Sequence, residues 1–372
     1  MRAYYLDRIR IFLTILVIFH HTAIAFGASG GWYYVSPESA SGSAQMLLSF
    51  FMTIDQAYFM SFFFLISALL MPASYERKGF GKFIKDRLVR LGIPLIIYIL
   101  LIHPTVVWFV LNHTGQNISW LQITWHLISR EPGPGPMWFV LTLLIFELLY
   151  AFYMKFRGHG NSGQYLAKMP SGLGIILFIL GTGITAFLVR LGYPTGKNFF
   201  GLQFGYFPLY IAMYIVGIVA ARRHWLEKFT LRQSKPWFYL SVAAILVLMV
   251  VMMQNAGTDM SSFNGGWNKS ALFYAMWEPF VCVGFCFYFT LLARDYLNRP
   301  NNFVTAMSRA SYPAYIIHPL IVVLSTFELE SLPVSPCLKI VGVCLLAVPI
   351  CFWTGVLFNR IIKNEKSKAS AS

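Results

Sequence analysis

Charged side chains are scarce in this chain of 372 residues. Asp, Glu, Lys and Arg make up only 12% of it, and just 14 residues are acidic, whereas 57% are hydrophobic. An ordinary soluble domain has about 25% charged residues, so the low charge excludes that class. Collagen-like and disordered chains are excluded as well, because 17% of the residues are aromatic. With a mean hydropathy of +0.62, the composition is typical of an integral membrane protein.

Cysteine is also sparse, and its pattern indicates no special chemistry. The five cysteines lie in apolar segments, with neither the spacing of a metal site nor the even number of a disulfide framework. We therefore expect apolar packing for them, and no metal. The net charge of +15 accompanies no basic face or nucleic-acid-binding motif, so nucleic acid is not an expected partner.

Ten apolar runs are long enough to cross a bilayer, which takes about 20 mostly apolar residues in a helix. They lie near residues 10–27, 47–71, 92–111, 137–154, 172–192, 205–221, 237–254, 272–293, 312–327 and 338–359. No long soluble insert separates them. The sequence therefore predicts one all-helical membrane domain over residues 1–372, with a short basic tail at 360–372.

Lysine and arginine are distributed unevenly between the connecting segments. Starting with the N-terminal segment, alternate segments carry 24 of the 29 Lys and Arg residues. Because cytoplasmic loops are enriched in these residues, the pattern predicts that both termini are cytoplasmic. A cleaved signal peptide is the competing interpretation of the first span. His20 and His21 would interrupt the apolar part of such a signal, which favours a span.

The first span contains two ionisable residues where a bilayer makes them costly. Arg10 and His21 are eleven residues apart, which is about three helical turns and roughly 16 Å. They therefore share one helix face, with Thr14 and Val17, while His20 points about 100° away. A neutral imidazole in this position could accept a proton from a hydroxyl group. The alternative is a histidine hydrogen-bonded to a neighbouring helix.

A second basic feature precedes the third span. Arg87 and Arg90 are three residues apart, and in a regular helix they would share a face. Paired guanidinium groups suit phosphate, because each donates two parallel hydrogen bonds. The alternative is anchoring against anionic membrane lipid.

Three acidic residues are predicted to lie within the membrane. Glu147 is in the middle of the fourth span, where a carboxylate must be neutralised or find a cation, such as His21 or Arg10. Asp55 and Glu278 lie nearer the outer side, and for both we expect contact with water or with the membrane interface.

Five short motifs occur in register with these spans. They are Arg10 followed by His21 after ten residues, Phe62-Phe-Phe-Leu-Ile-Ser67-Ala68, Arg87-Leu-Val-Arg90, Pro136-Met-Trp138-Phe139, and Tyr315-Ile-Ile-His318. Together they resemble the acyltransferase-3 family of integral membrane acyltransferases, although Ala68 replaces the usual glycine of the second motif. Gly30-Gly-Trp-Tyr-Tyr34 in the first outer loop is similar to the branch that succinylates periplasmic glucans.

The resemblance implies transfer of an acetyl or succinyl group from cytoplasmic acyl-CoA to a hydroxyl of a glycan, lipid-linked sugar or other exported acceptor, in the inner membrane of a bacterium. At the matching positions it implies a set of site residues: His21 as the catalytic histidine, Arg10 as its motif partner, Arg87 and Arg90 for the CoA phosphates, and Trp138 and His318 near the substrate. Among the intramembrane acids, Glu147 is a candidate catalytic residue and Asp55 a candidate substrate contact. Either could orient the imidazole. Direct transfer and an acyl-histidine both remain open.

A transporter of a polar or anionic solute is the alternative from another class. Ten spans with internal charges suit it equally well. The sequence shows no inverted repeat and no matching pair of broken helices, which favours the enzyme.

Overall fold

The computed structural model describes residues 3–130, 133–157, 169–255 and 260–369. Within these ranges the regular structure is helical, apart from one isolated β-bridge between Phe199 and Leu202. Ten helices in this part of the chain are long and apolar enough to cross a membrane, so the predicted number of spans is confirmed. Residues 370–372 of the predicted tail lie outside the described residues. The orientation of the termini stays a prediction.

The chain forms two compact units, each assembled from separated stretches of sequence. The first unit comprises residues 1–53, 96–137 and 296–372, and the second comprises residues 54–95 and 138–295. α2 (Gly42–Leu69) begins in the first unit and ends in the second.

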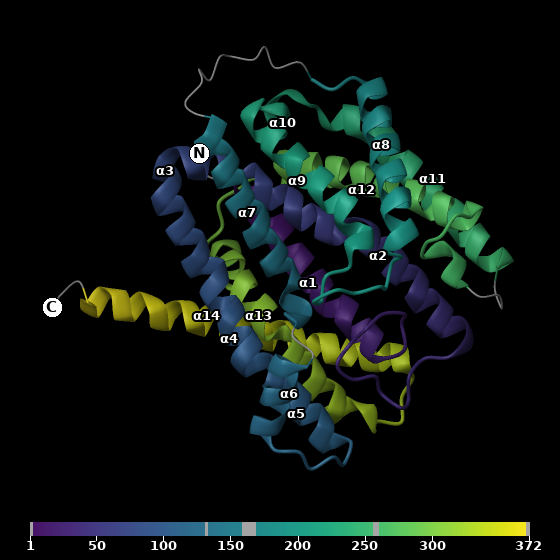
Figure 1. The fold of residues 1–372 in the computed structure, drawn as a ribbon, viewed down its shortest axis with the longest axis vertical. Coiled ribbons are helices and arrows are strands. Elements are labelled where there is room, and N and C mark those ends of the chain that lie inside the picture. The colour runs from purple at the N-terminus through teal and green to yellow at the C-terminus, as the bar shows by residue number, and fades with distance from the viewer. Residues whose placement is uncertain (1–2, 131–132, 158–168, 256–259, 370–372) are drawn as a thin grey trace. The chain divides into compact units, whose positions relative to one another are not determined.

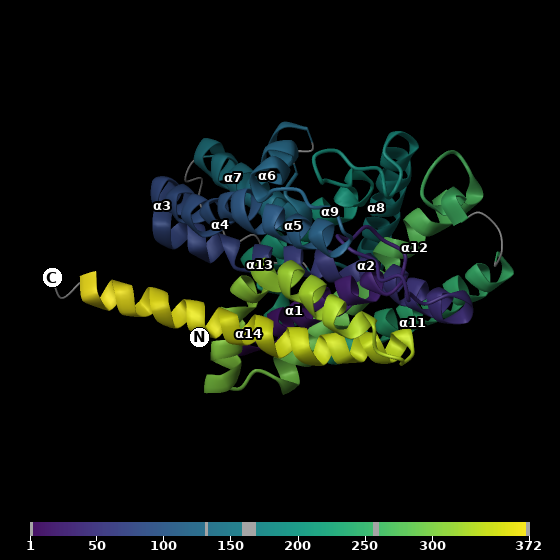
Figure 2. The same ribbon diagram turned by 90° about the horizontal axis from the view of Figure 1, so that it is seen from below.

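The first unit is built on three helices that pack together: α1 (Tyr4–Ala25), α13 (Asn302–Glu330) and α14 (Pro336–Ala369). α13 and α14 run side by side (Figures 1 and 2). Small residues allow this close approach. A Cβ atom placed on Gly355 would lie only 2.6 Å from the carbonyl oxygen of Ala310. The unit also contains the loop 26–41, α5 (His103–His113) and α6 (Trp120–Ser129).

Most of the remaining helices belong to the second unit, and the short α4 (Ile93–Ile97) crosses from it into the first. In chain order the helices of the second unit are α3 (Met71–Arg87), α7 (Trp138–Arg157), α8 (Gly172–Gly192), α9 (Phe207–Arg222), the short α10 (Trp225–Lys228), α11 (Leu231–Gln254) and α12 (Lys269–Tyr296). α3 packs against α7, and α8 against α9. Because these helices have apolar faces, the sequence predicts them as consecutive spans.

The third predicted span differs most from the structure. Helical residues run from Met71 to His113, with a kink at Gly79, whose φ is +70°, so most of the basic segment that precedes the predicted third span is helix. Two turns of this helix, Leu88–Gly92 and Tyr98–Ile102, are wider π turns. Proline at 94 and 104 follows each of them closely. Because proline has no N–H to bond the carbonyl four residues earlier, the helix widens there instead of breaking.

Candidate active site

The predicted catalytic histidine lies against a second histidine. α1 is continuous from Tyr4 to Ala25, so Arg10 and His21 share one face as predicted, about 16 Å apart along the helix. Nδ1 of His21 lies 3.0 Å from Nε2 of His318 on α13. His318 is fully buried. The structure therefore brings together the first and last motifs of the sequence.

A proline holds His318 in place. Pro319 has no N–H, and the carbonyl four residues before it belongs to Tyr315. That carbonyl lacks its usual helical donor, and Nδ1 of His318 bonds to it instead. The Tyr-x-x-His-Pro sequence thus builds its own side-chain anchor inside the helix.

This anchor fixes the proton positions of both imidazoles. A carbonyl oxygen only accepts hydrogen bonds, so Nδ1 of His318 carries a proton. Nε2 of a neutral His318 is then an acceptor, and Nδ1–H of His21 donates to it. In a neutral His21 donating through Nδ1, Nε2 is the unprotonated nitrogen, and a backbone hydrogen bond to Val17 also constrains the ring. A histidine in this tautomer, with its other nitrogen bonded to an orienting group, is suited to act as a general base.

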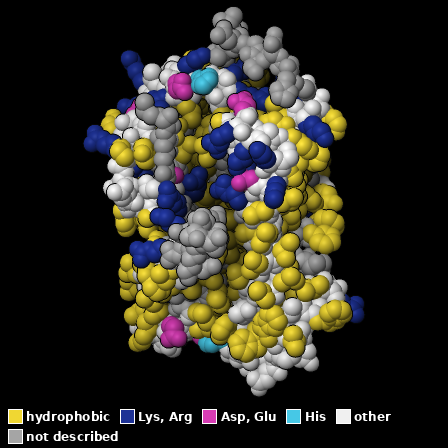
Figure 3. All heavy atoms as spheres, turned by 90° about the vertical axis from the view of Figure 1, so that its left-hand side faces the viewer, with side chains coloured by type: hydrophobic (Ala, Val, Ile, Leu, Met, Phe, Trp, Pro, Cys, Tyr) yellow, Lys and Arg dark blue, Asp and Glu magenta, His cyan; other side chains and the backbone are white. Residues whose placement is uncertain are grey.

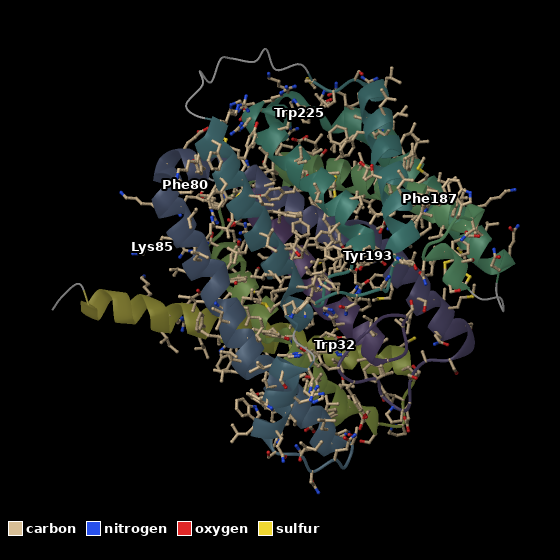
Figure 4. The ribbon with its side chains drawn as sticks, in the orientation of Figure 1. Trp32, Phe80, Lys85, Phe187, Tyr193 and Trp225 are labelled. Carbon is tan, nitrogen blue, oxygen red and sulfur yellow. The ribbon has the colours of Figure 1, made fainter. Side chains whose placement is uncertain are left out.

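An aromatic stack covers His21. Trp32, on the loop 26–41 and labelled in Figure 4, stacks on the imidazole with ring centroids 4.1 Å apart and planes 16° apart. The nearly parallel ring of His318 lies at the edge of His21, with centroids 5.0 Å apart and the two rings joined through His21 Nδ1. Trp32 and His318 are 6.0 Å apart and also nearly parallel. His21 therefore keeps one ring orientation.

The two residues that follow Trp32 hold its loop in place. The hydroxyl of Tyr33 lies 2.9 Å from that of Tyr98 and also bonds Nδ1 of His103. Burial raises the pKa of Tyr33, so its phenol stays neutral at physiological pH. The next residue, Tyr34, donates to Glu330 at 2.7 Å.

Further along the loop, the buried Lys339 bonds both Glu38 and the carbonyl oxygen of Glu330. His113 also bonds the Glu330 carboxylate, at 2.6 Å. Side chains from α5, α13 and α14 thus hold the loop that covers His21.

Arg10 ties α1 to α13. Its guanidinium lies 3.3 Å from Asp7 and donates to Ser308 at 3.1 Å. Ser308 in turn donates to Asp7 at 2.7 Å. The Arg10 side chain is still partly exposed, at 29%.

In the second unit, the two arginines of the Arg-x-x-Arg motif have different environments. Arg87 is 12% exposed and Arg90 is 65% exposed. Nε of Arg87 lies 3.3 Å from the Glu147 carboxylate, and its Nη2 donates to Ser74 at 2.8 Å. Both guanidinium groups lie near the same carboxylate oxygen of Asp86, Arg87 at 3.8 Å and Arg90 at 3.9 Å, although a π turn begins at Leu88 between them. The joint role of the two arginines stays a prediction.

Arg87 is the cation that pairs with the Glu147 carboxylate. The carboxylate is 3% exposed and lies on α7. The contacts within this unit show Glu147 as the counter-ion of Arg87. The orienting bond to His21 comes from His318.

The exposed side of α3 is basic. Lys82 and Lys85 are exposed, and Lys85 points away from the helix (Figure 4). Dark-blue Lys and Arg side chains gather on the face that carries α3 (Figure 3). Such a surface attracts anions, whether lipid headgroups or the phosphates of a soluble ligand.

The expected contact of Glu278 and Asp55 with water or the interface is wrong. Both side chains are 1% exposed. Glu278 forms an ion pair with Arg190, which also donates to the carbonyl of Gly205 at 3.0 Å. Asp55 is buried beside Tyr58, one turn along α2. Charges in the membrane interior are placed where protein groups surround them.

Arg190 is a buried residue that sequence analysis missed. The prediction counted it with the outer loops, but it is fully buried on α8. The rings of Tyr206 and Tyr274 lie 5.4 and 5.2 Å from its guanidinium carbon. Trp138 begins α7 as predicted and stacks on Tyr210, with centroids 5.6 Å apart. In the described residues, no three His, Cys, Asp or Glu side chains cluster as metal ligands.

The comparisons with known proteins agree with the motifs. A family model described as an acyltransferase domain matches residues 3–356. The chain belongs to the acyltransferase-3 family. It is therefore a membrane acyltransferase, and the enzyme prevails over the transporter. No solved structure matches the chain.

Curated relatives are similar over part of their length. Glucans biosynthesis protein C of Escherichia coli (strain K12) is 28% identical over 196 residues, covering 49% of this chain and 47% of that protein. The protein of the same name from Salmonella heidelberg is 25% identical over 238 residues, covering 59% and 58%. The chain spans about half the length of the curated relatives it matches.

The Arg87–Glu147 pair predicts a stability effect. Arg87→Ala leaves a buried carboxylate without its cation, which we expect to lower the free energy of unfolding by about 3 kcal/mol. Adding Glu147→Gln should recover most of the loss, because a neutral amide needs no counter-ion. Unfolding in detergent measures both effects. Arg90→Ala is the matched control and should change stability by less than about 0.5 kcal/mol; equal effects of the two alanine variants would contradict the pairing.

Proposed function

We propose that this acyltransferase moves an acetyl or succinyl group from acyl-CoA, bound from the cytoplasm, to a hydroxyl group of a glycan, a lipid-linked sugar or another exported acceptor. The His21–His318 pair carries the proposal, because the second imidazole orients His21 as a base. The names of the relatives, which refer to glucan biosynthesis, support a sugar hydroxyl as acceptor. The inner membrane of a bacterium is the proposed location.

The reaction is an attack by the acceptor oxygen on the thioester carbon. Nε2 of His21 removes the hydroxyl proton as the new C–O bond forms, and the carbonyl electrons move to its oxygen. The resulting tetrahedral intermediate collapses when the C–S bond breaks. The CoA thiolate takes the proton back from His21, which leaves an ester and a free thiol. Transfer through an acyl-histidine would use the same nitrogen as nucleophile.

His318 acts as a positioning residue rather than as a substrate contact. It accepts the hydrogen bond of His21 Nδ1–H and stabilises the imidazolium that forms when Nε2 gains a proton. Arg10 lies about 16 Å from His21 along α1, so it does not act on the reacting atoms. The partly exposed guanidinium suits the phosphate end of the donor, with the pantetheine arm spanning the distance to His21.

The remaining contacts are proposed from the chemistry of individual side chains, each described within the second unit. Arg90 and the neighbouring lysines of α3 are exposed and suit the CoA phosphates. Arg87 is also a proposed contact for the CoA phosphates, and Glu147 holds its guanidinium in position. Trp138 offers an aromatic face for a sugar ring, and Asp55 stays a candidate acceptor contact.

His21→Asn tests the proposal. Asparagine still donates a hydrogen bond but cannot act as a base, so we expect loss of turnover by at least about 10²-fold. Purified protein in detergent is incubated with labelled acetyl-CoA or succinyl-CoA, with and without a pool of candidate sugars, and free CoA thiol and labelled ester are measured. His224→Asn, which removes an exposed histidine of the second unit, is the matched control. A His21→Asn protein with unchanged turnover would refute the role of this histidine.

Arg90→Ala tests the donor site separately. Removing one exposed guanidinium should raise the KM for acyl-CoA and leave kcat unchanged, because phosphate contacts bind the ground state and the transition state equally. The measurement is a donor titration at low and high salt, since a phosphate contact weakens with salt. Arg130→Ala, on an outer segment by the predicted topology, is the control. An Arg90→Ala protein with the wild-type KM would remove Arg90 from the donor site.

A further inference from the structure

Trp32 has a polar atom whose partner is missing. Its indole Nε1–H is buried and has no hydrogen-bond acceptor among the described residues. Leaving a buried donor unpaired costs about 1–3 kcal/mol, so such a group calls for an explanation. The indole lies directly on the catalytic imidazole. A ligand that reacts at His21 is therefore the nearest source of an acceptor.

The loop gives this N–H a fixed position. Tyr33 bonds Tyr98 and His103 on one side of Trp32, and Tyr34 bonds Glu330 close by. Gly30 adopts a φ of +148°, and a Cβ there would lie 2.7 Å from Ile24 of α1. The backbone just before Trp32 therefore packs against the helix that carries His21. A donor held in this way needs no rearrangement during a reaction.

The stacking also limits how far the N–H lies from the reacting atoms. The two rings are nearly parallel with centroids 4.1 Å apart, so their planes are separated by no more than that distance. A hydroxyl bonded to Nε2 of His21 lies near the imidazole plane, and the carbonyl carbon that it attacks lies about 3–3.5 Å from the hydroxyl oxygen. Nε1–H of Trp32 lies in the neighbouring plane.

We propose that Trp32 is a further catalytic residue, whose Nε1–H donates a hydrogen bond to the thioester oxygen as that oxygen becomes an anion. The inference rests on the proposed acyl transfer at His21. When the acceptor oxygen attacks, the carbonyl electrons move to the oxygen and the hydrogen bond from Trp32 strengthens. The bond weakens again when the C=O re-forms and the thiolate leaves. Trp32 gains and loses no proton in the cycle.

Trp32→Phe tests this role, because phenylalanine keeps a stacked ring and removes only the donor. We expect kcat for release of CoA from labelled succinyl-CoA to fall about 10²-fold, the usual cost of one oxyanion donor, with the donor KM unchanged. Trp125→Phe is the matched control, since this tryptophan is 72% exposed on α6 in the same unit. Elution volume and the unfolding midpoint in detergent show that each variant is folded.

Binding of an unreactive donor provides the second readout. In a CoA ketone, with CH2 in place of the thioester sulfur, the carbon chain cannot leave and turnover is absent. Trp32→Phe should weaken ketone binding far less than it lowers kcat, because the proposed bond strengthens when charge develops on oxygen. A loss of binding as large as the loss of kcat, or a raised KM with unchanged kcat, would show a purely ground-state contact and overturn the inference. A Trp32→Phe protein as fast as wild type would overturn it too, while the proposed function would stand. If wild-type protein released no CoA at all, the proposed function and this inference would both fail.

Discussion

The carbonyl oxygen of Tyr315 determines the chemistry of this site. Pro319 deprives it of its helical donor, and His318 replaces that donor with an imidazole N–H. Since the carbonyl can only accept, the proton positions of His318 and then of His21 follow in order. One missing backbone N–H in α13 thus selects the nitrogen of His21 that is free to react. A carboxylate orients the histidine in serine hydrolases, whereas here a neutral imidazole does so within an apolar bundle.

A neutral orienting group suits a site inside a membrane protein. A buried carboxylate would need its own cation or several hydrogen bonds. In the second unit, two buried carboxylates are each paired with an arginine: Glu147 with Arg87, and Glu278 with Arg190. The histidine pair requires no such compensation. Because His318 bonds the edge of His21, a face of the imidazole is left for the ring of Trp32, which the loop 26–41 carries.

Helical periodicity and hydropathy predict much of this architecture. The ten spans and the shared face of Arg10 and His21 follow from local spacing alone. The contact between His21 and His318 does not, because it depends on α1 packing beside α13 almost 300 residues later. A local signal was nevertheless present, since Pro319 stands four residues after Tyr315 and frees its carbonyl. Pro94 is likewise a local signal for the widened turn at Leu88–Gly92. Arg190 illustrates the opposite case: counting charges by loop cannot show that a residue near a helix end turns inward to a carboxylate 88 positions away.

The proton position on His21 is the central claim, and nitrogen NMR of the imidazoles tests it most directly. Protein labelled with 15N in its histidine rings would be compared with a His21→Asn sample, so that the difference spectrum assigns the ring. The structure predicts that, at neutral pH, His21 carries its proton on Nδ1 and none on Nε2, with Nδ1–H coupled to Nε2 of His318. A proton on Nε2 of His21 would contradict the account, because the nitrogen that must accept a proton from the acceptor hydroxyl would already be occupied.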